Sequence, residues 1–162
     1  MMEKPTVWVR KELPWLRSGP LWHIHEDALP ELDAMLDRFG YIRIELDGAE
    51  MTSRVKAHQA LGVAFDFPDW YGRGWDAFHD CIYGFASAHE GQRVAVLWRN
   101  IDLAAASAPA TTVEVGWALI QVATGEWPTP GPMLPTTMHL DVFAIGTGDN
   151  FDRPPRDGDG IV

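Results

Sequence analysis

The chain has 162 residues, of which 46% are hydrophobic, and a formal net charge of −10. This length and apolar content predict one domain with a core of its own. The acidic balance argues against a nucleic-acid-binding protein, which needs a basic surface, and is compatible with a basic protein partner. No apolar run approaches the roughly 18–20 residues of a membrane span, and we expect no secretory leader because residues 1–5 contain no apolar stretch. The single cysteine, Cys81, fits a reducing, cytoplasmic setting.

The first half of the chain alternates strand-like and helix-like segments. The expected elements, in chain order, are a short edge strand at 6–9, a strand at 21–25, a helix from Pro30 to Gly40, a strand at 41–46 that ends at Asp47-Gly48, and a helix that Thr52 or Ser53 caps and that runs to about Leu61. His58 lies in this last helix beside apolar residues, which favours a packed, hydrogen-bonded histidine over a metal ligand.

The second half continues the alternation. The expected elements are a loop at 62–73, a helix that begins near Trp75 and ends between Phe85 and Ala88, a buried strand at 94–98, an apolar helix at 113–123, a loop at 125–132, a strand at 139–145 and a loose tail from Asp152. Strands that alternate with helices predict an α/β fold with a mostly parallel sheet.

The most informative stretch is residues 67–82, where a loop with two aromatic residues, Trp70 and Tyr71, turns into a helix. Gly72 and Gly74 allow backbone conformations with positive φ, or the close approach of another chain. A helical projection places Asp76, His79, Asp80 and Tyr83 on one face, and Trp75, Phe78, Cys81, Ile82 and Phe85 on the other. We interpret the polar face and the adjoining loop as the working surface, with Trp70 exposed.

Three interpretations of Asp76 and Asp80 compete. A solvated helix face is the commonest fate of such a pair. A metal site or general acid–base pair would use His79 as a third group. The third interpretation is an anionic surface that docks into a cationic pocket of a partner.

Motifs for catalysis are scarce elsewhere. His23 and His25 share one face of a strand, as do His139 and Asp141, but nothing in the sequence makes these segments neighbours of His79. The chain contains no nucleophile elbow, phosphate-binding loop or dinucleotide fingerprint.

The motif Trp70-Tyr71-Gly72-x-Gly74-x-Asp76-Ala77-Phe78-x-Asp80-Cys81-Ile82 resembles the signature of barstar-type ribonuclease inhibitors. That signature is an aromatic pair, a glycine, a spaced asparagine, then Asp-Ala-Leu-x-Asp and an apolar pair. The likeness extends over about residues 41–145, through the strand at 41–46 and the elements that follow in family order. It implies a barstar-like α/β fold with a three-stranded parallel sheet and packed helices, here preceded by an N-terminal β-α extension. The expected division is 1–40 for the extension, 41–148 for the barstar-like domain and 149–162 for the loose tail.

The resemblance also implies a function. Barstar-like proteins are cytoplasmic inhibitors or immunity proteins that plug the active site of a basic ribonuclease or nuclease toxin, without catalysis, cofactor or metal. By this analogy Asp80 enters the nuclease pocket in place of a substrate phosphate, Asp76 pairs with a second cationic group and Trp70 stacks on a histidine of the enzyme. Tyr71, Gly72 and Gly74 correspond to the docking loop, and His79 stands where the family often carries a large aromatic residue.

Two departures bear on the target. Gly74 replaces the usual asparagine, and His79 is smaller and titratable. The family's acidic residue on the helix before the last strand has no certain counterpart, since Glu114 lies at the start of the 113–123 helix.

Two alternatives stay open beside the inhibitor: a metal-dependent hydrolase, and a barstar-fold interaction or regulatory module with no nuclease target.

Overall fold

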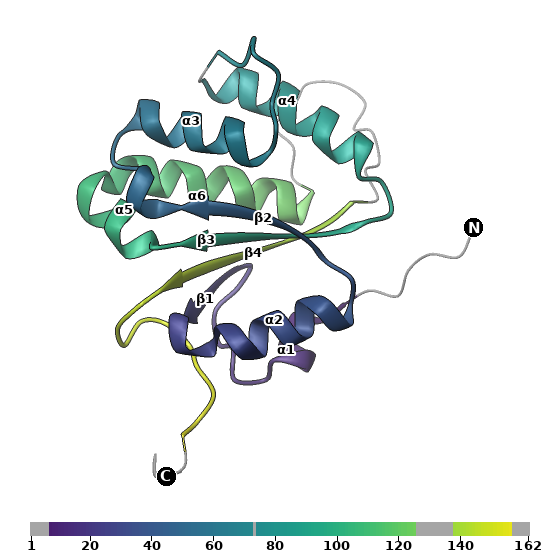
Figure 1. Ribbon diagram of the computed structural model, residues 1–162, viewed down its shortest axis with the longest axis vertical. Coiled ribbons are helices and arrows are strands. Elements are labelled where there is room, and N and C mark those ends of the chain that lie inside the picture. The colour runs from purple at the N-terminus through teal and green to yellow at the C-terminus, as the bar shows by residue number, and fades with distance from the viewer. Residues whose placement is uncertain (1–6, 73, 126–137, 157–162) are drawn as a thin grey trace.

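A parallel sheet of four strands lies between two layers of helices (Figure 1). The computed structural model describes residues 7–72, 74–125 and 138–156. The strands are β1 (Leu21–His25), β2 (Ile42–Asp47), β3 (Arg93–Arg99) and β4 (His139–Gly146). The helices are α1 (Val9–Glu12), α2 (Leu29–Arg38), α3 (Arg54–Ala64), α4 (Trp75–Ala88), α5 (Ile101–Ser107) and α6 (Pro109–Thr124), with short 3-10 turns η1 (Glu26–Ala28) and η2 (Gly48–Glu50).

The strand order is β1-β4-β3-β2, and all three pairings are parallel. The α/β class and the parallel sheet are therefore confirmed, but the expected number of three strands is wrong. The fourth strand is β1, which comes from the N-terminal extension and pairs with β4 in the register Leu21↔Val142 to His25↔Gly146.

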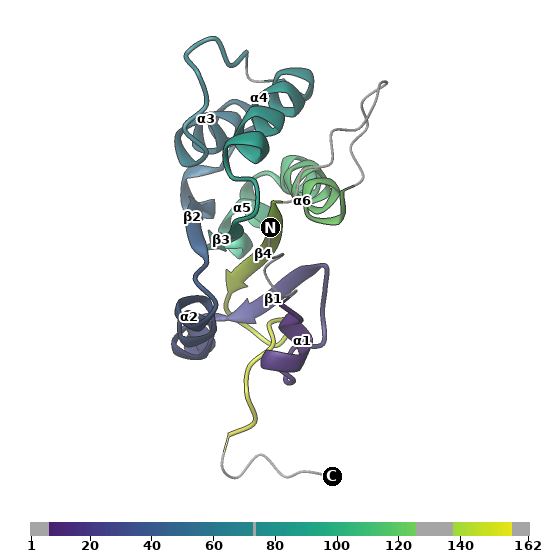
Figure 2. The same ribbon diagram turned by 90° about the vertical axis from the view of Figure 1, so that its right-hand side faces the viewer.

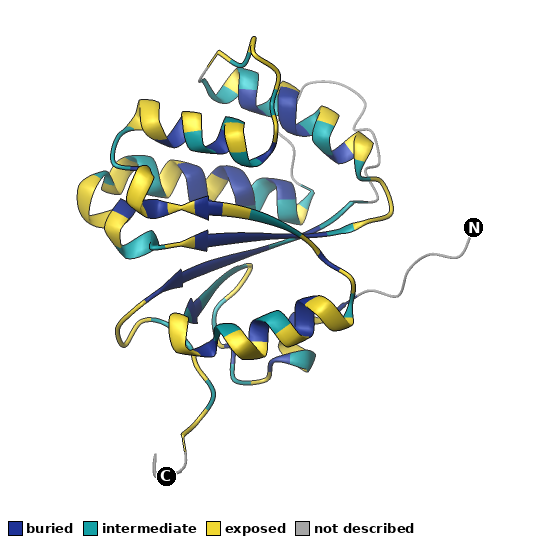
Figure 3. Cartoon of the chain, viewed as in Figure 1, coloured by how far each residue is buried: buried dark blue, intermediate teal, exposed yellow. Residues whose placement is uncertain are grey.

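Each face of the sheet is covered by its own helices, as Figures 1 and 2 show from two sides. Helices α3 to α6 cover one face, and α1 and α2 cover the other. The first core includes Leu46, Phe78, Ile82, Val96 and Trp98, and the second includes Ile24, Leu32, Leu36, Leu97 and Phe143. Strand β3 supplies residues to both cores, so Val94–Trp98 are all buried (Figure 3), as the continuous apolar run predicted.

The other expected elements that fall on described residues are found with shifted ends, apart from the strand at 6–9. That prediction is wrong for the described residues, since Val9 begins the short helix α1. The loop expected at 125–132 lies outside the described residues beyond Gly125. Helix α5 was not expected; it follows Asn100, whose φ of 52° is left-handed. Ser53 is the cap of α3, because its side chain accepts a hydrogen bond from the Lys56 amide. Among the described residues, no helix has the length and apolar character to cross a membrane.

The C-terminal segment is held against β1 as far as it is described. The backbone of Asp152 bonds to His25 N–H at 2.8 Å and to His23 C=O at 2.9 Å. Its carboxylate accepts from the amides of Arg17 (2.9 Å) and Ser18 (3.2 Å) and from the Ser18 hydroxyl (3.1 Å). The tail expected to be loose is therefore anchored at residue 152, while residues 157–162 lie outside the described residues. The division of the chain into extension, domain and tail stays a prediction.

Candidate functional site

Helix α4 presents one apolar and one polar side. Phe78, Cys81 and Ile82 are buried, and Asp76 and Asp80 are exposed. His79 and Tyr83 are half-buried rather than displayed, and the Nε2 atom of His79 is buried without a hydrogen-bond partner among the described residues. The two carboxylates are therefore the accessible charges of this helix.

The turn into α4 does not use the special backbone freedom of its glycines. Gly74 is the N-cap with φ −124° and ψ 164°, which any residue adopts, and Gly72 is also outside the positive-φ region. A Cβ at either position would meet open space. Gly74 supplies no side-chain cap, so the start of the helix keeps an amide donor that an asparagine would have satisfied.

The loop before α4 is fixed by aromatic rings that pack face to face and edge to face. Phe67 lies 5.6 Å from Phe65, 5.1 Å from Tyr71 and 5.9 Å from Phe78, measured between ring centroids. Trp70 is left outside this cluster with 64% of its surface exposed. The prediction of a surface tryptophan beside α4 is thus confirmed, and its position is set by the packed neighbours.

Tyr71 points in the opposite direction, toward α3. Its hydroxyl lies 2.5 Å from Nδ1 of His58, which is 1% exposed. Burial raises the pKa of Tyr71, so the hydroxyl keeps its proton and can donate it to the imidazole. Burial also lowers the pKa of His58, with a smaller contribution from Arg54. This neutral pair ties the loop to α3, in agreement with the expectation of a packed, hydrogen-bonded His58.

Trp75 ties the start of α4 to two other helices. Its ring lies 4.5 Å from that of His58 on α3, and its indole N–H donates to the carboxylate of Glu114 on α6 at 3.2 Å. Glu114 therefore stands beside the first turn of α4, although the sequence did not assign it there. The sequence feature that could have identified Glu114 is its position at the start of the apolar helix expected at 113–123.

A hollow of about 530 Å³ lies on the side of α4 that faces β2 and the aromatic loop. Phe65, Phe67 and Phe85 line it, Trp70 and Asp80 border it, and Gly84 leaves it open on the helix side. Asp80 has no hydrogen bond or ion pair within the described part of the chain, so its oxygens are free to bind a donor. Asp76, His79 and Tyr83 do not line this hollow. The structure thus places Trp70 and Asp80 beside the same hollow, whereas the other predicted site residues are not part of its lining.

The metal interpretation finds no assembled ligand set. Within residues 7–72, 74–125 and 138–156, no three His, Cys, Asp or Glu side chains are placed to hold an ion. His139 and Asp141 are 2.7 Å apart, and Tyr41 donates to the same carboxylate at 2.7 Å, so this pair belongs to a network on β4. The pKa of the Cys81 thiol is raised by burial and by Asp80, which disfavours a nucleophilic thiolate.

The His58–Tyr71 pair predicts that the fold weakens in mild acid. The unfolded chain takes up a proton at His58 near the ordinary pKa of 6.5, whereas the folded chain resists it. Since the unfolded state then binds more protons, the free energy of unfolding falls as pH drops below about 6.5. Thermal unfolding at about pH 7.5 and about pH 5.5 should show a larger loss for the natural chain than for His58→Gln, which cannot titrate. Equal losses in both proteins would assign the acid sensitivity to other groups.

Comparison with known proteins gives a family match whose range includes the loop and α4. The family model described as Barstar (barnase inhibitor) matches residues 41–138, which is more than half of the chain. The matched range contains the loop, α4 and Glu114, and excludes β1, α1 and α2. No curated protein matches the chain.

Proposed function

The chain belongs to the barstar (barnase inhibitor) family, and from this membership we propose that it binds a basic ribonuclease or nuclease toxin and occludes its active site. The observation that supports the proposal most directly is the hollow beside α4, where one free carboxylate, Asp80, borders a cavity with aromatic walls. A pocket of this kind suits the cationic and aromatic side chains that bind phosphate in a ribonuclease.

Within this proposal the residues have distinct roles. Asp80 takes the place of a substrate phosphate, and Trp70 offers an exposed ring on which a histidine of the enzyme stacks. Asp76, in the first turn of α4, pairs with a second cation of the enzyme. Tyr71 holds the loop through His58, and its half-buried ring borders the contact with the partner. Gly72 and Gly74 keep the approach to the helix open, and His79 and Tyr83 border the contact.

The overall charge supports the same partner class. The chain carries −10, and a basic nuclease would be drawn toward it over distances beyond direct contact. The association rate is then expected to fall as salt is added, because screening acts on the encounter. The proposal includes no catalysis by this chain, and the reducing, cytoplasmic setting stays a prediction.

The test is inhibition of RNA hydrolysis by a panel of basic secreted and toxin ribonucleases, together with calorimetry of the same pairs. We expect at least one enzyme to be inhibited in a one-to-one complex. If none is inhibited and the protein co-purifies with a partner that is not a nuclease, the alternative of a barstar-fold regulatory module is favoured.

A further inference from the structure

The two outer strands of the sheet differ in how their edges are covered. The free edge of β1 is closed at residues 23–25 by the backbone of Asp152 and by the Ser18 hydroxyl, which accepts from His23 N–H at 2.7 Å. Strand β2, at the opposite edge, is paired with β3 alone among the described residues. Alternate residues of the six-residue strand β2 therefore present backbone donors and acceptors on an open edge, which natural proteins usually protect.

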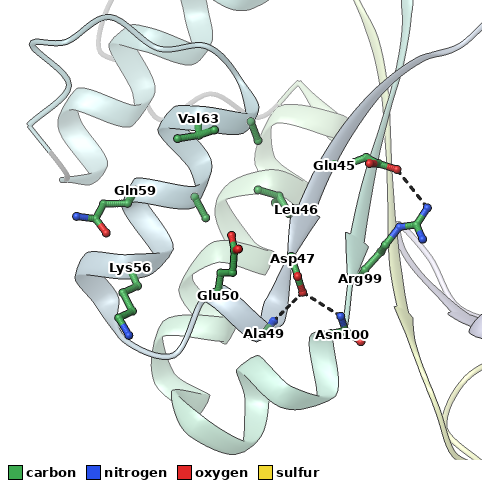
Figure 4. A pocket seen from close by; sticks show the side chains of 12 residues that line it. Glu45, Leu46, Asp47, Ala49, Glu50, Lys56, Gln59, Val63, Arg99 and Asn100 are labelled. Atoms are coloured by element: carbon green, nitrogen blue, oxygen red, sulfur yellow. Dashed lines mark hydrogen bonds and ion pairs between the residues drawn. The ribbon is translucent and has the colours of Figure 1, made fainter.

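A groove runs along this open edge. A hollow of about 840 Å³ lies between β2, η2 and α3, and Figure 4 shows Lys56, Gln59 and Val63 on the helix side and Glu45, Leu46 and Asp47 on the strand side. Ala64 also lines the smaller hollow that contains Ile44 and Asp80. The two hollows therefore share Ala64 in their linings, and both lie beside β2.

The groove has an apolar floor and a net negative charge. Ala60 and Ala64 supply apolar surface above the buried Leu46, and Val63 at the rim is 83% exposed. The lining carboxylates are Glu45, Asp47 and Glu50 in the larger hollow and Asp66 and Asp80 in the smaller one. Lys56 and Arg99 are the lining cations, and Arg99 is already paired with Glu45 at 3.2 Å.

We propose that this groove binds an extended, basic peptide segment of a partner, which pairs with β2 as a fifth strand. In such a strand alternate side chains point to opposite sides, so one set enters the groove, where the apolar stems of Lys or Arg lie along its floor and their cationic ends reach Glu50 and its neighbours. The charge of the groove selects a basic segment. A second copy of the chain is disfavoured, because each copy carries −10. The inference does not depend on the nuclease inhibition proposed above, since strand pairing uses the backbone edge of β2, and of the β2 residues Ile44 alone lines the hollow beside α4.

The test uses an eight-residue peptide in which lysine alternates with valine, with capped ends. Amide hydrogen exchange is measured by NMR across the whole chain, with and without the peptide. We expect exchange within residues 42–47 to slow by about 10-fold or more, because new backbone hydrogen bonds form there. A peptide of the same sequence with alternate backbone nitrogens methylated keeps the charge but loses donors along the strand, and it should protect β2 little or not at all.

A variant pair separates the groove from general attraction to an acidic protein. Glu50→Lys reverses a charge that points into the groove in Figure 4, and should weaken binding of the lysine–valine peptide by about 5-fold or more. Glu31→Lys makes the same change on α2, across the sheet, and should leave the affinity nearly unchanged. Protection confined to α4, equal binding of the methylated peptide, or equal effects of the two variants would overturn the proposal. If the protein forms a dimer through β2 in the absence of peptide, the partner at this edge is a second copy of the chain and not a basic segment.

Discussion

Asp80→Ala is expected to weaken binding to an inhibited ribonuclease by about 100-fold or more, which is the largest effect of any single change on the binding surface. Asp80 is exposed in the free protein and borders the hollow beside Trp70. In the complex its carboxylate would be desolvated among the enzyme's cations. Removing it leaves those cations buried without a counter-charge, and that penalty adds to the lost hydrogen bonds.

The matched variants separate charge from shape. Asp80→Asn keeps the size of the side chain but removes its charge, so it should lose nearly as much affinity as the alanine variant. Asp149→Ala removes an exposed carboxylate from the loop after β4 and changes the net charge equally, so it should alter affinity by less than about 3-fold. Asp76→Ala is expected to have an intermediate effect, because Asp76 does not line the hollow.

The measurement is calorimetry, with dissociation rates recorded for the same complexes. The loss for Asp80→Ala should lie in faster dissociation, since the contact forms after the charged surfaces have met. Unchanged affinity for Asp80→Ala with an enzyme that the natural chain inhibits would show that another surface blocks the nuclease. Circular dichroism of each variant guards against a folding defect, which is not expected at an exposed position.

Periodicity was sufficient to predict the elements with strong patterns. The five buried residues of β3 form one apolar run, and α4 alternates core and polar positions with helical spacing. Helix α5 escaped prediction because it is short and rich in alanine, with no sustained apolar stripe. Periodicity also could not predict which strands pair, since β1 and β4 are separated by more than 100 residues in the chain.

The candidate site was predicted in the same uneven way. The polar face of α4 follows from spacing alone, but the approach of Trp70 to Asp80 depends on how the aromatic loop folds back. The hydrogen bond between Trp75 and Glu114 joins helices that are far apart in sequence, so no local sequence pattern predicts it. His79 was placed on the displayed face by its angle, whereas its position among packed helices buries Nε2.

Deletion of residues 1–40 is expected to abolish cooperative folding, although the family match begins only at residue 41. These residues contain β1 and α2, which cover one edge and one whole face of the sheet. Leu97, Phe143 and Ile145 are at most 2% exposed in the second core. Exposing such side chains costs about 1.5–3 kcal/mol each, and three of them already approach the total stability of an ordinary domain.

The shortened chain should therefore unfold without a sharp thermal transition and bind a hydrophobic dye, and it should not inhibit any nuclease that the full chain inhibits. Ile24→Ala provides a milder version of the same test, because Ile24 is fully buried on β1, and should lower the free energy of unfolding by about 2–5 kcal/mol without touching α4. Cooperative unfolding of residues 41–162 with retained inhibition would instead make the extension a separable appendage. The expected outcome follows from the sheet itself: its apolar strands β3 and β4 present side chains to both faces, and among the described helices those of the extension cover the second.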